Sequence, residues 1–136
     1  MMEEFNNWDE IAENFADACA EVVEQTADDG AFNVEQQITD NGQVVTGLMR
    51  GSVYINTYDH STYGAFTGKY DEKYLLDQVE LPEDRYSAYF AVAASYAWFP
   101  NYGTRFQAAN PFWEPAIDKT WEDFERHLSE IEANLR

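Results

Sequence analysis

Residues 96–117, YAWFPNYGTRFQAANPFWEPAI, join a tight turn to the start of a long helix. Tyr102, Gly103 and Thr104 form the turn, and Asn110 and Pro111 stand a few residues further on. Asparagine is a favourable helix N-cap, and proline is favourable in the first helical turn. Aromatic side chains flank the turn, but no catalytic group is concentrated there. We therefore interpret this stretch as a docking and folding element.

The residues after this start predict an amphipathic helix over 110–135. Its apolar positions recur at spacings of four and three, which places them on one face of a helix. They are Ile117, Trp121, Phe124, Leu128, Ile131 and Leu135. We expect this helix to pack on a small sheet.

A second amphipathic helix is predicted near the start of the chain, over residues 3–25. Its apolar positions run from Phe5 to Val23, and acidic residues fill the opposite face. The turn signal Asp28-Asp29-Gly30 predicts that this helix ends before residue 28. Residues 31–40 fit either a short second helix or a strand, and the dipeptide Asn41-Gly42 can close a hairpin.

Two strands are predicted between the helices, over 53–58 and 86–94, where β-branched and aromatic residues gather. We expect these strands to pair. Residues 59–85 are polar and rich in tyrosine, which predicts an extended loop with one helical turn near 72–76. The predicted fold class is α+β, with a small antiparallel β-sheet packed against long N-terminal and C-terminal helices. At this length, residues 1–136 are expected to form a single domain.

Charge is the second strong signal. Eight Lys and Arg stand against 26 Asp and Glu, giving a net charge of −18, and no basic residue precedes Arg50. Such a surface repels nucleic acid, so we expect no sequence-specific nucleic-acid binding. The acidity fits adaptation to a high-salt host, a lining past which DNA slides, or a soluble acidic surface.

Signatures of catalysis and cofactor binding are absent from the sequence, which has no Gly-rich phosphate loop, GxSxG, HExxH or CxxC. We therefore expect no catalytic residue, no cofactor and no metal, and a protein that is not an enzyme. His60 lies beside Asp59 in the loop, and His127 is expected to be solvated on the last helix. The single cysteine, Cys19, excludes an internal disulfide and is expected to be a buried structural thiol.

Two alternatives stay open. Acidic clusters such as Asp28-Asp29 and residues 122–125 can bind hard cations, so a small acidic metal-binding protein or hydrolase is a distant alternative. Saturable binding of divalent ions in calorimetry would distinguish it. An acidic inhibitor that mimics nucleic acid is the other, and it predicts tight, salt-sensitive binding to a basic protein.

Cellular location is read from apolar runs and from the N-terminal charge. No apolar run approaches the ~20 residues of a membrane span, so no membrane partner is expected. The acidic start of the chain differs from the basic start of a signal peptide, so we expect synthesis in the cytoplasm.

Tyrosines crowd the middle of the chain, and this residue type suits protein interfaces because it combines contact area with a polar tip. We predict that the tyrosine-rich loop and the turn after it contact other subunits. The candidate interface residues are Tyr63, Tyr70, Tyr74, Tyr102, Arg105 and Phe106.

Two motifs resemble the tail-completion, or neck, proteins that join head and tail in long-tailed double-stranded DNA phages and related tailed viruses. The first is TGLMRGS at 46–52, which precedes the first strand and contributes Thr46, Gly47, Leu48, Arg50 and Ser52. The second begins at Tyr96, Ala97 and Phe99, continues at Tyr102, Gly103 and Thr104, and ends at Pro111, Phe112, Pro115 and Ala116. We interpret most of these residues as fold-defining, with Gly103 supplying an unusual backbone angle.

This resemblance implies a structural virion protein of the head–tail junction that completes or joins the tail through ring-forming contacts. It implies a homo-oligomer, usually a six-fold ring, with the tail terminator, the connector and the tail tube as partners. The tail terminator itself and a head-closing connector are the alternatives within the same neck. The expected location is the virion, with the host cytoplasm during assembly.

Overall fold

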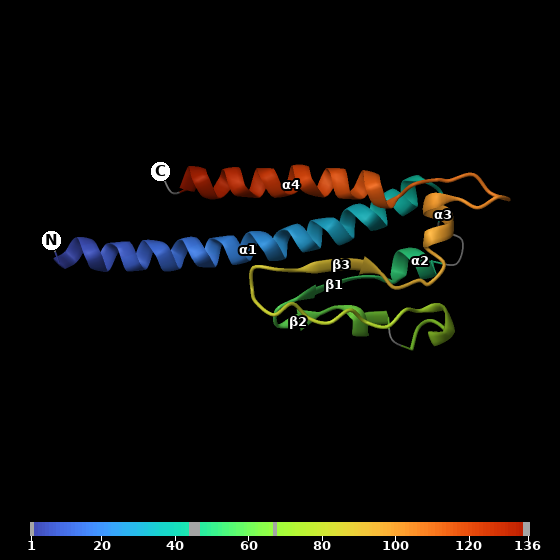
Figure 1. Cartoon of the computed structure of the whole chain (residues 1–136), viewed down its shortest axis with the longest axis horizontal. Coiled ribbons are helices and arrows are strands. Elements are labelled where there is room, and N and C mark those ends of the chain that lie inside the picture. Colours follow the sequence, from blue (N-terminus) through green and yellow to red (C-terminus); the bar gives the residue numbers. More distant parts are fainter. Residues whose placement is uncertain (1, 44–46, 67, 135–136) are drawn as a thin grey trace.

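The computed structural model describes residues 2–43, 47–66 and 68–134. Two long antiparallel helices, α1 (Met2–Asp40) and α4 (Trp113–Asn134), lie side by side, and a small sheet lies against α1 (Figure 1). The sheet contains β1 (Val53–Thr57), β2 (His60–Ser61) and β3 (Tyr89–Val92), in the order β2-β1-β3. The connections carry four short helices: α2 (Leu48–Gly51), η1 (Tyr63–Phe66), η2 (Glu72–Tyr74) and α3 (Trp98–Tyr102). The predicted α+β class is confirmed.

Helix α1 is one continuous element of 39 residues, so the predicted end before residue 28 is wrong. Gly30 lies inside the helix and is buried, because the ring of Phe90 packs directly on its backbone. A Cβ atom at Gly30 would lie 2.4 Å from Phe90 Cε1. This glycine therefore permits close packing of α1 on the sheet. Residues 31–40 are helical, and Val34 and Ile38 are fully buried there.

The C-terminus of α1 explains the dipeptide Asn41-Gly42. Gly42 has a φ of 71°, its N–H bonds Thr39 O at 3.0 Å, and Gln43 N–H bonds Ile38 O at 3.0 Å. This paired arrangement is the Schellman motif, which satisfies the last carbonyl groups of a helix. The dipeptide caps α1 and does not close a hairpin.

The start of α4 differs from the predicted start at residue 110, because the helix begins at Trp113. Asn110 does not cap it. Instead, the buried side chain of Asn101 accepts hydrogen bonds from the N–H groups of Phe112 and Trp113, both at 2.9 Å. Asn101 lies in α3, which continues through Pro100 because proline in a first helical turn has no bond to donate.

The predicted pairing of the two main strands is confirmed. β1 and β3 are antiparallel, and Val53 stands opposite Val92. Both strands are shorter than predicted, since β1 ends at Thr57 and β3 spans Tyr89–Val92 only. The first strand is buried throughout, because α1 covers one face of the sheet and the segment after β2 covers the other.

Residues 59–85 are an ordered layer and not a simple excursion. They contain β2, η1 and η2, which includes the helical turn predicted near 72–76. The ring of Tyr63 packs edge-on against Tyr54 and Phe66. Asn56, which is fully buried in β1, donates a side-chain hydrogen bond to Val79 O. These contacts attach the layer to the face of the sheet opposite α1.

The main core cluster lies where α1, α2, β1 and α4 meet. Its buried members are Val34, Ile38, Leu48, Met49, Val53, Ala94, Phe112 and Ala116. Beyond this cluster, the N-terminal part of α1 and the C-terminal part of α4 extend past the sheet (Figure 1). Trp8, Ile11 and Phe15 are exposed on that extension.

Candidate protein-interaction site

The connection between α3 and α4 projects at the end of the molecule opposite the two chain termini (Figure 1). We call residues Gly103–Ala109 the α3–α4 loop. Gly103 has a φ of 83°, and a Cβ atom there would lie 2.7 Å from Ala109 N. The two ends of the loop are therefore in contact, as in an Ω-loop, and only glycine permits both this backbone angle and this approach.

Hydrogen bonds hold the tip of this loop in one conformation. Thr104 N–H donates to Gln107 O at 2.9 Å, and Phe106 N–H donates to Thr104 Oγ1 at 3.1 Å. The guanidinium of Arg105 lies 4.5 Å from the centroid of the Phe106 ring. Phe106 is nevertheless 84% exposed, the highest fraction among the exposed large apolar side chains of the described chain. The loop thus presents an ordered aromatic group and a cation to solvent.

The base of the loop is attached to the end of α1. Asn110 N–H donates to Pro100 O at 2.9 Å. Asn41 Nδ2 donates to Pro111 O at 2.7 Å, and Gln43 Nε2 donates to Asn110 O at 2.9 Å. The loop therefore projects from a rigid base.

Tyr102 and Glu114 connect α3 to the first turn of α4. The Tyr102 hydroxyl bonds the Glu114 carboxylate, and this bond raises the pKa of the tyrosine. Desolvation acts to raise the pKa of Glu114, but hydrogen bonds from Tyr102, its own backbone N–H and Asn101 outweigh it, so the pKa is lowered. The ring of Tyr102 also packs on Trp98, with centroids 4.1 Å apart.

The structure separates the six predicted interface residues into two groups. Tyr102, Arg105 and Phe106 are all exposed, Tyr102 at the end of α3 and the other two in the α3–α4 loop. Tyr63 and Tyr70 are half-buried within the 59–85 layer, where the Tyr63 hydroxyl donates to Leu76 O at 2.8 Å. Tyr74 is exposed on that layer, with Lys73 Nζ 4.9 Å from its ring centroid.

The fold-defining motif residues lie mostly in or beside the main core cluster. Leu48 and Phe112 are members, and Ser52 Oγ accepts a bond from Ala94 N–H at 3.1 Å. Gly47 has a φ of 79° ahead of α2, and Arg50 Nη1 donates to Thr39 Oγ1 at 3.3 Å. Pro111 is exposed just before α4 and Pro115 is exposed in its first turn. Gly103 and Thr104 belong to the loop, and Thr46 lies outside the described residues.

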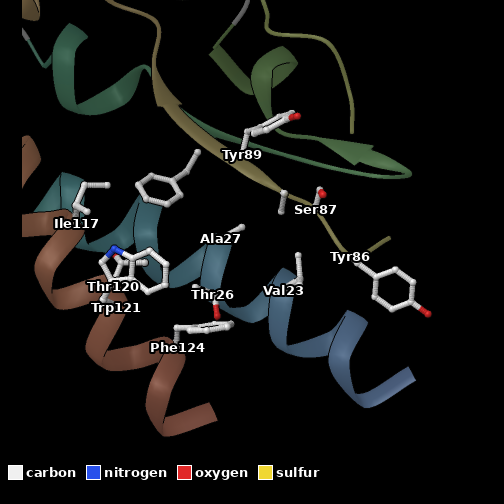
Figure 2. A pocket seen from close by; sticks show the side chains of 12 residues that line it. Val23, Thr26, Ala27, Tyr86, Ser87, Tyr89, Ile117, Thr120, Trp121 and Phe124 are labelled. Atoms are coloured by element: carbon white, nitrogen blue, oxygen red, sulfur yellow. The ribbon is translucent and has the colours of Figure 1, made fainter. Parts of the chain in front are cut away.

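An apolar groove lies between α4 and the edge of β3, with α1 as its floor (Figure 2). We call it the α4 groove; its volume is 460 Å³. Ile117, Trp121 and Phe124 of α4 form one wall, Val23 and Ala27 of α1 lie on the floor, and residues 86–90 form the other wall. Trp121 is 61% exposed. Part of the predicted apolar stripe of α4 therefore lines a groove. The spacing showed that these residues share one face of the helix, but it did not show which surface faces them.

Polar residues contribute to the contact between α1 and α4. Asn33 Nδ2 donates to Thr120 Oγ1 at 3.1 Å and to Asp123 Oδ2 at 2.9 Å. His127 Nε2 lies 2.6 Å from Asp29 Oδ2, and only 12% of its side chain is exposed. The expectation of a solvated His127 is wrong, because this face of α4 packs against α1. His60 is exposed in β2, and Cys19 is half-buried.

The described residues hold no group of three or more histidine, cysteine or acidic side chains arranged to bind a metal ion. Within the same ranges, no helix has both the length and the apolar character of a membrane span. Comparisons with protein-family models, with characterised proteins and with solved structures give no match to this chain.

Proposed function

We propose that this protein is a structural component of the head–tail junction of a tailed virus, where it completes or joins the tail. It acts by binding and geometry, through self-association into a ring and through contacts with the connector, the tail terminator or the tail tube. No chemical step is part of the proposal.

The observation that supports it most is the meeting of the two motif segments. Leu48 and Met49 come from the first motif, and Phe112 and Ala116 come from the end of the second. These pairs are distant in the sequence, yet they share the main core cluster with Val34 and Ile38 of α1. Two short motifs whose residues depend on each other for packing are a more specific pattern than either motif alone.

The exposed surface also supports an assembly role. Monomeric proteins rarely leave large apolar areas uncovered, and such areas commonly mark protein–protein contacts. Here Trp98 and Tyr102 are exposed and packed on each other in α3, and Phe106 is exposed in the loop that follows. Aromatic residues of this kind are the usual anchors of protein interfaces.

The test is co-purification with neck proteins. The tagged protein would be mixed with the connector, the tail terminator and the tail tube of the same virus, and retention would be compared with a Phe106→Ala, Trp98→Ala variant. We expect retention of at least one neck protein and weaker retention by the variant. The position of the protein in a cryo-EM map of the virion would then distinguish tail completion from tail termination or head closure. A monomer that retains none of the three proteins would refute the proposal.

A further inference from the structure

The α4 groove has the character of a binding site for an aromatic side chain. Its α4 wall presents the rings of Trp121 and Phe124, whose centroids lie 5.8 Å apart in an edge-on arrangement. The floor is the small apolar pair Val23 and Ala27 (Figure 2). At 460 Å³ the groove accommodates an aromatic ring together with the aliphatic stem of an arginine. Burying one such ring contributes substantially to an interface.

The opposite wall offers backbone hydrogen-bonding groups. β3 is an edge strand, and Ala93 N–H bonds Ser52 O at 3.0 Å just beyond its end. Bonded and non-bonded pairs alternate in an antiparallel ladder, so Ala91 and Tyr89 direct their backbone groups toward β1. Phe90 and Val92 consequently direct theirs away from the sheet, toward the outside. A loop seated in the groove can therefore bond to this edge.

Acidic side chains at the rim of the α4 groove favour a ligand that carries a positive charge. Asp118 precedes Trp121 by three residues and Glu125 follows it by four, so both lie on the same side of α4 as the tryptophan. Both acidic residues are exposed. At the far end of the groove, Arg85 is already paired with Asp17 at 2.6 Å. An apolar group accompanied by a cation fits this rim, whereas the acidic remainder of the chain is repelled by it.

The α3–α4 loop has the matching chemistry. It presents Phe106 beside Arg105, one of only eight basic residues in the chain, and hydrogen bonds already fix its tip. A fixed conformation lowers the entropy cost of binding. Within one copy the loop projects away from the groove (Figure 1), because its base is bonded to residues 41–43 and Ala27 lies ~20 Å back along α1.

We propose that the α3–α4 loop of one copy inserts Phe106 into the α4 groove of a second copy, with Arg105 beside Glu125 and Asp118 of that copy. The contact joins two different surfaces, and repetition of such a contact closes a ring or extends a filament. In the proposed neck ring this contact joins neighbouring subunits, and the closure of the contacts into a ring rests on the proposed function. The pairwise contact itself is testable on the purified protein alone.

The first experiment measures self-association by sedimentation velocity over a range of concentrations at about 0.15 M salt. We expect Phe106→Ala to weaken association at least about tenfold, as expected for truncation of a central aromatic anchor. Arg105→Glu should also weaken it, and the double variant Arg105→Glu, Glu125→Arg should restore it. Phe32→Ala is the matched control, because Phe32 is an exposed aromatic residue of α1 outside the groove.

The second experiment tests the geometry with engineered disulfides in a Cys19→Ser background. The pair Arg105→Cys with Glu125→Cys should form crosslinks between copies, whereas Arg105→Cys with Asp59→Cys should not. A wild-type protein that stays monomeric at every concentration would overturn the contact. So would association unchanged by Phe106→Ala, or equal crosslinking by the two pairs. Failure to bind other neck proteins with self-association intact would instead count against the proposed function alone.

Discussion

The side chain of Asn101 is the main N-terminal cap of α4, and replacing it with alanine is the sharpest test of how this fold is held together. Asn101 is 3% exposed and accepts from two backbone N–H groups, those of Phe112 and Trp113, at 2.9 Å each. Its amide also donates to the Glu114 carboxylate at 3.1 Å. Asn101→Ala removes all of these bonds without adding a group that can replace them.

The expected cost follows from what the substitution leaves behind. Each hydrogen bond contributes about 1 kcal/mol net, and an orphaned buried donor costs about 1–3 kcal/mol. Phe112 is fully enclosed, so water cannot reach its N–H, whereas Trp113 is half-buried and water can replace its partner. We therefore expect a loss of about 2–3 kcal/mol in the free energy of unfolding. For a domain of this size that lowers the melting temperature by roughly 6–12 °C.

The assay is thermal and urea unfolding followed by circular dichroism, with Asn110→Ala as the matched control. Asn110 precedes the same helix, but its side chain is exposed and donates only to Asn41 O, at 3.2 Å. Its loss should cost about 0.5 kcal/mol or less, as for a surface substitution. If the two variants lose equal stability, or if Asn110→Ala loses more, the assignment of the cap to Asn101 is wrong.

Three further predictions concern packing, pH and salt. Gly30→Ala should destabilise the protein by about 1–3 kcal/mol through overlap with the Phe90 ring, although alanine normally favours a helix; Phe90→Leu should rescue it, and a stabilised single variant would contradict the packing. The pKa of Glu114 is lowered in the fold, so the stability that its charge contributes is present above its usual value of 4.5 and is lost as the pH falls through the lowered pKa. Unfolding curves of wild type and Glu114→Gln should therefore differ at neutral pH and converge in acid. If the net charge of −18 reflects a high-salt host, the melting temperature should rise markedly from dilute buffer to molar KCl, and an unchanged value would exclude that explanation.

The long elements of this fold were predictable because they depend on periodicity. The spacing of apolar residues located both long helices, and the β-branched and aromatic runs located the pairing of β1 with β3. The predicted helix boundaries were wrong where a residue that resembles a local end signal is explained by contacts with distant residues. Gly30 looks like a helix end, but the residue that requires a glycine there is Phe90, far away in the sequence. Asn110 has the local signature of an N-cap, and Asn101, the actual cap, comes from the preceding helix.

Of the two surfaces in the proposed contact, only the α3–α4 loop was predicted from the sequence. The turn at Tyr102–Phe106 was predicted to be a contact from its aromatic residues, and that function stays a prediction. The α4 groove was missed, because the spacing of Ile117, Trp121 and Phe124 shows which residues share a face and not what they face. The polar pairs Asn33–Asp123 and Asp29–His127 take the place beside α1 that an apolar stripe normally occupies. No spacing rule identifies two polar residues that bond across two helices.

The cap and the proposed contact are physically linked, and this link gives the loop hypothesis a consequence that does not involve its surface. Residues 100–101 bond to residues 110–113, and these bonds hold the two ends of the α3–α4 loop together. A variant that removes these bonds leaves Phe106 and Arg105 unchanged but allows the loop many conformations. Restricting the loop to one conformation on binding then costs free energy. Asn101→Ala should therefore weaken self-association at temperatures where the protein is still folded, whereas Phe66→Leu, a destabilising change in the buried cluster of the 59–85 layer and outside the groove, should not. Equal association by the two variants would mean that the fixed shape of the loop does not matter to the contact, and the case for insertion into the α4 groove would lose its main physical support.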